Sequence, residues 1–233
     1  MKLKEHLNEL VDTVTRHPLL KIYEKLQSSP IDPGKFDAFK QSYGFDVPPK
    51  LRDAYSENNG FTIIYGLKDN SDEGLVKFNS ASKDYMVEKG PPYIIGSVKF
   101  LTFEESFLED TWRTTLYDMG SESDKDKFVF RKTEYTYNDF GKQLKPFDLF
   151  SEETCAAFLL IPDERFEVIL LTDHYADWKN SRIISFDDYW SLVFSTGAIT
   201  DARERYLSEA GGDDLQKMAL PPVEKIRPAI FSK

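Results

Sequence analysis

The stretch that decides the fold is YGFDVPPKLRDAYSENNGFTIIYG, residues 43–66. The consecutive prolines Pro48 and Pro49 suit the first turn of a helix, where a missing backbone N–H leaves no hydrogen bond unmade. Apolar residues then recur at helical spacing. Asn59-Gly60 supplies the left-handed conformation that ends a helix. Alternating apolar residues follow over 61–65. The stretch therefore predicts a helix, a tight glycine cap and a half-buried strand.

The chain before this stretch predicts helices. Residues 3–28 carry apolar side chains at helical spacing, interrupted by Pro18, so we expect one helical run before that proline and a second after it. The turn-rich sequence SSPIDPGK leads into a short helix around Phe36 and Phe39. We interpret residues 1–30 as a helical extension that packs on the domain.

The chain after this stretch predicts strands and then helices. A strand is expected over 93–101, followed by a short helix that a capping box of Thr102 and Glu105 opens. The apolar runs CAAFLLI and RFEVILLT are separated by PDER, which predicts a hairpin with an acidic turn. Ser185 caps a helix that stops at Gly197, and Thr200 caps another.

These elements predict an α+β fold. We expect one domain over residues 31–212, with a twisted, largely antiparallel sheet partly covered by helices. A proline-containing C-terminal tail over 213–233 completes the chain.

Composition favours a water-soluble protein that is not a secreted disulfide scaffold. The longest apolar run, 155–161, is far shorter than the ~20 residues that a bilayer span needs. The start MKLKEHLNEL lacks the apolar core of a secretory signal. The single cysteine, Cys155, lies in an apolar run and is expected to be a buried small hydrophobe. A cytoplasmic location without membrane contact is the expectation.

The acidic charge is concentrated in two windows. The net charge is −10, and residues 103–126 and 152–177 each carry −6, which leaves +2 for the rest of the chain. Such a surface repels the phosphates of nucleic acid, whereas a basic protein would be steered toward it. General solubility explains the same charge equally well.

No sequence motif indicates catalysis or a cofactor. Nucleophile-elbow, phosphate-loop and dinucleotide patterns are absent, and three scattered histidines with one cysteine do not form a usual zinc set. The cluster Asp173-His174-Tyr175-Ala176-Asp177 is the one exception, because His and Asp at that spacing can bind a metal or hold a water. We expect a strand-to-loop turn there, and no metal, cofactor or catalytic residue.

The helix–cap–strand unit at Pro48–Tyr65, with its Asn-Asn-Gly-Phe element at 58–61, resembles the core signature of the SUKH superfamily. The strand before the acidic helix, the PFDLF stretch and the 184–197 helix resemble later parts of the same family, so the resemblance spans roughly Tyr43 to Gly197. It implies a compact α+β domain and, in most members, an immunity protein that binds and neutralises a bacterial toxin, commonly a nuclease. No catalytic residue comes with the family.

The expected function is therefore non-catalytic protein binding, most directly toxin neutralisation. The acidic residues expected to contact a basic toxin are Glu122, Asp124, Asp126, Asp163, Glu164, Asp173 and Asp177. A regulatory scaffold or adaptor of the same fold is the alternative. A hydrolase that uses His174 is a third hypothesis.

Overall fold

The computed structural model describes residues 3–82, 90–109, 127–130, 132–151, 154–160, 167–172, 177–209, 216–217 and 231. The helices are α1 (Leu3–Arg16), α2 (Gly34–Tyr43), α3 (Pro49–Glu57), α4 (Asp72–Ser82), the π-helical turn η1 (Glu104–Leu108), α6 (Tyr137–Gly141), α7 (Phe186–Ser195) and α8 (Thr200–Glu209). The strands are β1 (Leu20–Gln27), β2 (Phe61–Leu67), β3 (Ile94–Phe100), β4 (Lys127–Phe130), β5 (Thr133–Thr136), β6 (Leu144–Asp148), β7 (Cys155–Leu159), β8 (Glu167–Thr172), β9 (Asp177–Ser185) and β10 (Gln216–Lys217).

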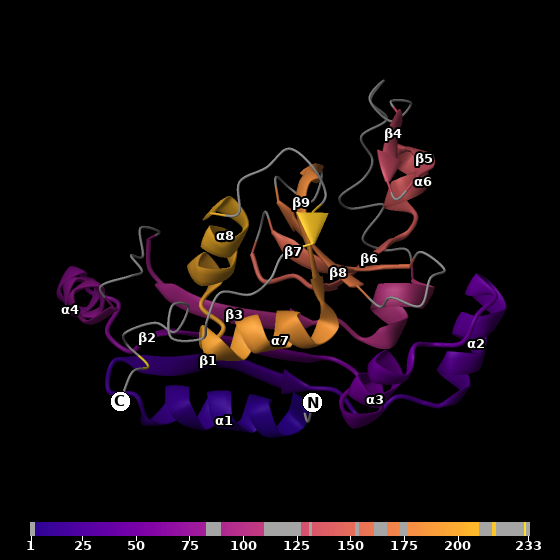
Figure 1. The fold of residues 1–233 in the computed structure, drawn as a ribbon. Coiled ribbons are helices and arrows are strands. Elements are labelled where there is room, and N and C mark those ends of the chain that lie inside the picture. The colour runs from indigo at the N-terminus through magenta and orange to yellow at the C-terminus, as the bar shows by residue number, and fades with distance from the viewer. Residues whose placement is uncertain are drawn as a thin grey trace.

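Eight strands form the main sheet, in the order β1-β2-β3-β6-β7-β8-β9-β10 (Figure 1). Neighbouring strands are antiparallel except for β9 and β10, which run parallel. Strands β3 and β6 meet where Phe100 lies opposite Asp148. The predicted α+β class and largely antiparallel sheet are confirmed, and so is the pairing of the two apolar runs as β7 and β8.

The larger core lies between the sheet and the helices α1 and α7, which lie on one side of strands β1–β3 in Figure 1. Trp190 of α7 is its central residue. The Trp190 ring is fully buried, with its centroid 5.8 Å from that of Phe61 and 5.5 Å from that of Phe100. Leu7 and Leu10 of α1 are buried in the same cluster. The helices thus cover one face of this half of the sheet.

A second core lies on strands β6–β9. The hairpin β4–β5 and helix α6 project from the main body at the upper right of Figure 1, and Phe130 and Phe140 anchor them. Cys155 is fully buried in this cluster, which confirms the expected buried position. Burial raises the pKa of its thiol well above the usual value, and the nearby Asp148 adds to the rise.

The buried Cys155 thiol gives a testable prediction. Labelling with a thiol reagent at neutral pH should be at least about a hundredfold slower in the folded chain than in urea, because the thiol has to be exposed by opening before it can react. Timed labelling followed by mass spectrometry measures both rates. Equal rates with and without urea would contradict the burial.

The deciding stretch folds as predicted, with one change at the helix end. Helix α3 starts at Pro49, but its C-cap Asn58 is extended (φ −150°), and the left-handed residue is Gly60 (φ +94°). A Cβ on Gly60 would lie 3.0 Å from the carbonyl oxygen of Phe100. The turn therefore passes close against the end of β3.

Asn59 locks that turn to the start of η1. Its Oδ1 accepts from the backbone N–H of Phe103 (2.8 Å), and its Nδ2 donates to Glu104 (3.0 Å). The predicted capping box is also present, because Thr102 Oγ1 accepts from the Glu105 N–H (3.2 Å) and Glu105 accepts from the Thr102 N–H (2.8 Å). The NNGF element is thus a structural junction.

We expect Asn59→Ala to lower the free energy of unfolding by about 1 kcal/mol, because the N–H of Phe103 loses its acceptor at the start of a helical turn. Urea denaturation followed by circular dichroism measures this. Ser56→Ala on the exposed face of α3 is the control, with an expected change within about 0.5 kcal/mol. Equal stability of the two variants would contradict the role given to Asn59.

The second N-terminal helix was a wrong prediction. Residues after Pro18 form strand β1, which pairs antiparallel with β2 from Leu20 opposite Leu67 to Gln27 opposite Phe61. A bulge between Ile22 and Glu24 breaks the strand's two-residue alternation. For this reason the spacing of Leu20, Tyr23 and Leu26 resembles that of a helix. Residues 20–27 are therefore part of the main sheet.

Helix α7 follows its predicted signals. Ser185 Oγ accepts from the Asp188 N–H (3.1 Å), and Gly197 has a φ of +63° just after the helix. Beyond it, Ile199 forms a bridge with Gly96 of β3, and α8 begins at Thr200.

Helix α8 is fastened to the sheet by a buried ion pair. Arg203 and Asp148 are both fully buried, with 2.9 Å between Nη1 and Oδ2. Asp148 also accepts from the Tyr189 hydroxyl and from the N–H of Lys99 (2.8 Å), while Arg203 donates to the carbonyls of Ser97 and Ala198. Burial raises the pKa of Asp148, and the guanidinium of Arg203 opposes that rise.

Candidate functional site

Strand β1 is one outer strand of the main sheet. The Ser28 N–H donates to the Gly60 carbonyl (3.0 Å), which continues the β1–β2 ladder by one residue. Because hydrogen-bonded and non-hydrogen-bonded pairs alternate in an antiparallel ladder, the backbone groups of Lys25 and Gln27 point away from β2. Outer edges of this kind are places where another extended chain can pair.

An apolar surface lies on the side of β1 opposite α1. Tyr23, Leu26 and Ile94 are 37%, 60% and 38% exposed. Ile94 lies opposite Gly66 in the β2–β3 pair, and the Tyr23 ring lies against Gly66. Residues opposite one another share a face of the sheet, so Tyr23 and Ile94 belong to one surface. We call Tyr23, Leu26 and Ile94 the edge patch.

The Tyr23 ring is held in place by polar contacts at its hydroxyl. The hydroxyl donates to the Leu67 carbonyl (2.8 Å) and accepts from Asn70 Nδ2 (2.6 Å). An aromatic side chain that is already ordered loses little conformational entropy when a partner covers it. Tyr23 is therefore a suitable anchor for a protein contact.

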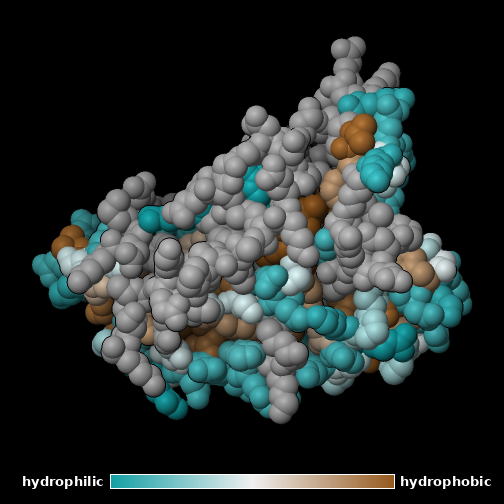
Figure 2. All heavy atoms as spheres, in the orientation of Figure 1, coloured by the Kyte–Doolittle hydropathy of each residue, from teal (hydrophilic) through white to brown (hydrophobic). Residues whose placement is uncertain are grey.

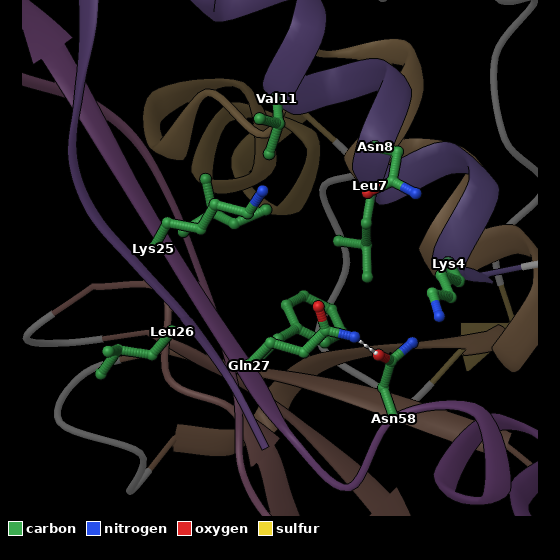
Figure 3. A pocket seen from close by; sticks show the side chains of 10 residues that line it. Lys4, Leu7, Asn8, Val11, Lys25, Leu26, Gln27 and Asn58 are labelled. Atoms are coloured by element: carbon green, nitrogen blue, oxygen red, sulfur yellow. Dashed lines mark hydrogen bonds between the residues drawn. The ribbon is translucent and has the colours of Figure 1, made fainter. Parts of the chain in front are cut away.

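A small pocket lies on the other side of β1, between β1 and α1 (Figure 3). Its space is about 20 Å³, which is room for about one water molecule or one polar group. Residues from α1, β1, β2 and the end of α3 line it: Lys4, Leu7, Asn8, Val11, Lys25, Leu26, Gln27, Asn58, Phe61 and Ile63. We call it the donor pocket, because of the groups described next.

Asn58 is the key polar group of the donor pocket. Its side chain is fully buried, and its Oδ1 accepts from Gln27 Nε2 across the pocket (Figure 3). Its Nδ2 has no hydrogen-bond partner in the part of the chain that the structure describes. The Asn58 N–H donates to the Ala54 carbonyl (3.0 Å), which fixes the backbone at this position.

The charged side chains of the pocket are lysines. Lys4 in the first turn of α1 and Lys25 of β1 are both exposed. The nearest acid with a recorded contact is Glu57, which accepts from the backbone N–H of Lys4 at 3.4 Å. The pocket thus offers hydrogen-bond donors and positive charge.

The acidic residues predicted for partner binding are not tested. Glu122, Asp124, Asp126, Asp163, Glu164 and Asp173, together with His174, lie outside the described residues. Asp177 begins β9 opposite Thr172 of β8, and nothing about its side chain is described. A contact between these residues and a partner stays a prediction.

Sequence reasoning missed the edge patch and the donor pocket. Both depend on β1, which was expected to be a helix. The alternation of Leu20 and Ile22 with Lys21 was the available signal for a strand, but it ends at the bulge after two apolar residues. Asn58 was noticed only as part of a turn.

Other exposed apolar residues are isolated. Figure 2 shows brown spots on α4 and on the projecting β4–β5 hairpin, each amid hydrophilic surface. Among the described residues, the exposed large apolar side chains of these two elements are Val76 of α4, 63% exposed, and Val129 of β4, 70% exposed. Single exposed apolar residues are common on protein surfaces and need no functional explanation.

Within the described ranges, no group of three or more His, Cys, Asp or Glu side chains is placed to hold a metal ion. Among the helices described, none is long and apolar enough to cross a membrane.

Comparison with known proteins gives no relative: no family model matches the chain, and neither the curated proteins nor the solved structures contain a significant match.

Proposed function

We propose that this chain works by binding another protein, as an immunity protein that neutralises a basic, nuclease-like toxin. The observation that carries the binding function is the edge patch, in which Tyr23, Leu26 and Ile94 are exposed on the strands β1 and β3, and no described strand pairs with the outer edge of β1. Exposed apolar groups beside free backbone donors and acceptors are the features by which protein segments recognise one another.

The charge of the chain supports a basic partner. A net charge of −10 attracts a basic protein and raises its association rate. The toxin proposal itself draws on the resemblance of residues 43–197 to the SUKH superfamily. Neutralisation would be stoichiometric: the bound chain covers the toxin's substrate groove, and the predicted acidic residues Glu122–Asp126 and 163–177 face its basic groups.

Co-expression tests the proposal. The probe is the toxic C-terminal domain encoded beside the gene for this chain, produced in a host that it kills. We expect the chain to restore growth, and His174→Ala to restore it equally, because binding needs no catalytic histidine. Rescue lost in His174→Ala would favour the hydrolase hypothesis.

The scaffold alternative predicts a different result. A scaffold or adaptor of this fold would bind a cellular protein and leave the toxin active, so growth would not recover. Val76→Asp changes an exposed apolar residue of α4 that is not part of the edge patch. This control variant should restore growth as well as the unchanged chain does.

A further inference from the structure

Asn58 Nδ2 at the donor pocket is buried and has no hydrogen-bond acceptor among the described residues. An unpaired buried amide is unfavourable because it has lost its water without gaining another bond. Lys4 and Lys25 place two ammonium groups at the same pocket (Figure 3). A negatively charged group that accepts hydrogen bonds would pair with the Asn58 amide and with the two ammonium groups.

The size of the pocket limits that group. About 20 Å³ takes a water or the end of one side chain, but not a metabolite or a nucleotide. The carboxylate of an aspartate or glutamate is small enough and accepts several hydrogen bonds at once.

Strand pairing along β1 determines how such a side chain reaches the donor pocket. The backbone groups of Lys25 and Gln27 point to the outer edge of β1, along which no strand of the described ranges pairs, so an added strand pairs with these two residues. A residue directly opposite Lys25 or Gln27 has its side chain on the same face of the sheet as theirs. That face is the one on which the donor pocket lies.

We propose that the donor pocket accepts an aspartate or glutamate side chain from an extended segment of a protein partner, which adds to the sheet along β1. The carboxylate accepts from Asn58 Nδ2 and pairs with Lys25 and Lys4. The neighbouring residues of the segment point to the opposite face and cover Leu26 and Tyr23. This inference rests on the proposed protein-binding function and specifies the partner's chemistry at one contact.

A pair of peptides tests the inference. The probes are acetyl-Thr-Val-Glu-Val-Thr-amide and its glutamine counterpart, titrated into the ¹⁵N-labelled full chain and followed by NMR. We expect the amides of Lys25 and Gln27 and the side-chain NH₂ of Asn58 to shift with the glutamate peptide. The glutamine peptide should bind about tenfold more weakly or worse, as expected for losing a charge-assisted hydrogen bond.

Two variants distinguish binding at the donor pocket from general electrostatic attraction to β1. Lys25→Gln should weaken the glutamate peptide about tenfold and leave the glutamine peptide unchanged. Lys21→Gln removes the same charge from β1 outside the pocket lining, and it should weaken both peptides equally or not at all.

Three results would overturn the inference: equal binding of the two peptides, shifts confined to other elements, or no binding, which would leave a water as the occupant of the pocket. Growth protection in the co-expression test is independent of these peptides. If protection persists while the peptides fail, protein binding stands and only the assignment to β1 falls.

Discussion

Arg203→Met is expected to lower the free energy of unfolding by about 3–5 kcal/mol, because it leaves the carboxylate of Asp148 buried without its counter-ion. Both side chains are 0% exposed in the 2.9 Å pair. The guanidinium also joins α8 to β3 through the carbonyl of Ser97 and to the α7–α8 turn through the carbonyl of Ala198. Urea denaturation monitored by tryptophan fluorescence measures the change.

The same helix supplies the control. Arg205 pairs with Asp201 at 2.8 Å, but its side chain is 45% exposed, and exposed pairs contribute only about 0–1 kcal/mol. Arg205→Met should therefore be nearly neutral. The double variant Arg203→Met with Asp148→Leu should recover part of the loss, because no buried charge remains. Similar losses in the two single variants would contradict the buried network.

Gly96→Ala is expected to cost about 1–3 kcal/mol or more, as overpacking of a filled core does. A Cβ at this position would lie 2.3 Å from the ring of Tyr65. That ring cannot easily move away, because it is fully buried and its hydroxyl donates to the Gly197 carbonyl at 2.5 Å. Thermal unfolding followed by circular dichroism measures the loss.

Gly90→Ala is the matched control for this substitution, because no atom of the described residues lies within 4 Å of a Cβ at Gly90. It should change stability by less than about 0.5 kcal/mol. If Gly96→Ala unfolds at the same temperature as Gly90→Ala, the packing of Tyr65 on β3 is not as described.

Local signals predicted the elements whose limits are set by nearby residues. Helix α3 starts at its prolines, and α7 starts at Ser185 and stops before Gly197, because caps and prolines act within a few residues. Strand β3 and the β7–β8 hairpin were predictable from apolar runs bounded by turns.

Strand β1 was not predictable in the same way. Its eight residues fit a helix about as well as a strand, because the bulge at Tyr23 interrupts the alternation. Pairing with β2, some forty residues later in the chain, decides its conformation. Such distant pairing leaves little trace in a local pattern.

The buried polar residues were missed for a related reason. Arg203 belongs to the charged run DARERYL, which is typical of an exposed helix, yet it is 0% exposed. Asn58 belongs to a turn, where asparagine is common. Only the packing of distant elements around these residues shows that Arg203 is a buried charge. The same holds for Asn58, whose Nδ2 donor has no partner among the described residues. The edge patch and the donor pocket, which both depend on β1, were thus beyond local reasoning.

The central claim is that this chain binds a protein partner along β1, and hydrogen–deuterium exchange tests it most directly. The chain would be measured alone and with the candidate toxin domain of the co-expression test. We expect slower amide exchange over residues 20–27 in the complex than in the free chain. The slowing should be largest at Lys25 and Gln27, whose amides point to the outer edge of β1. Unchanged exchange over 20–27, with slowing elsewhere or nowhere, would contradict it.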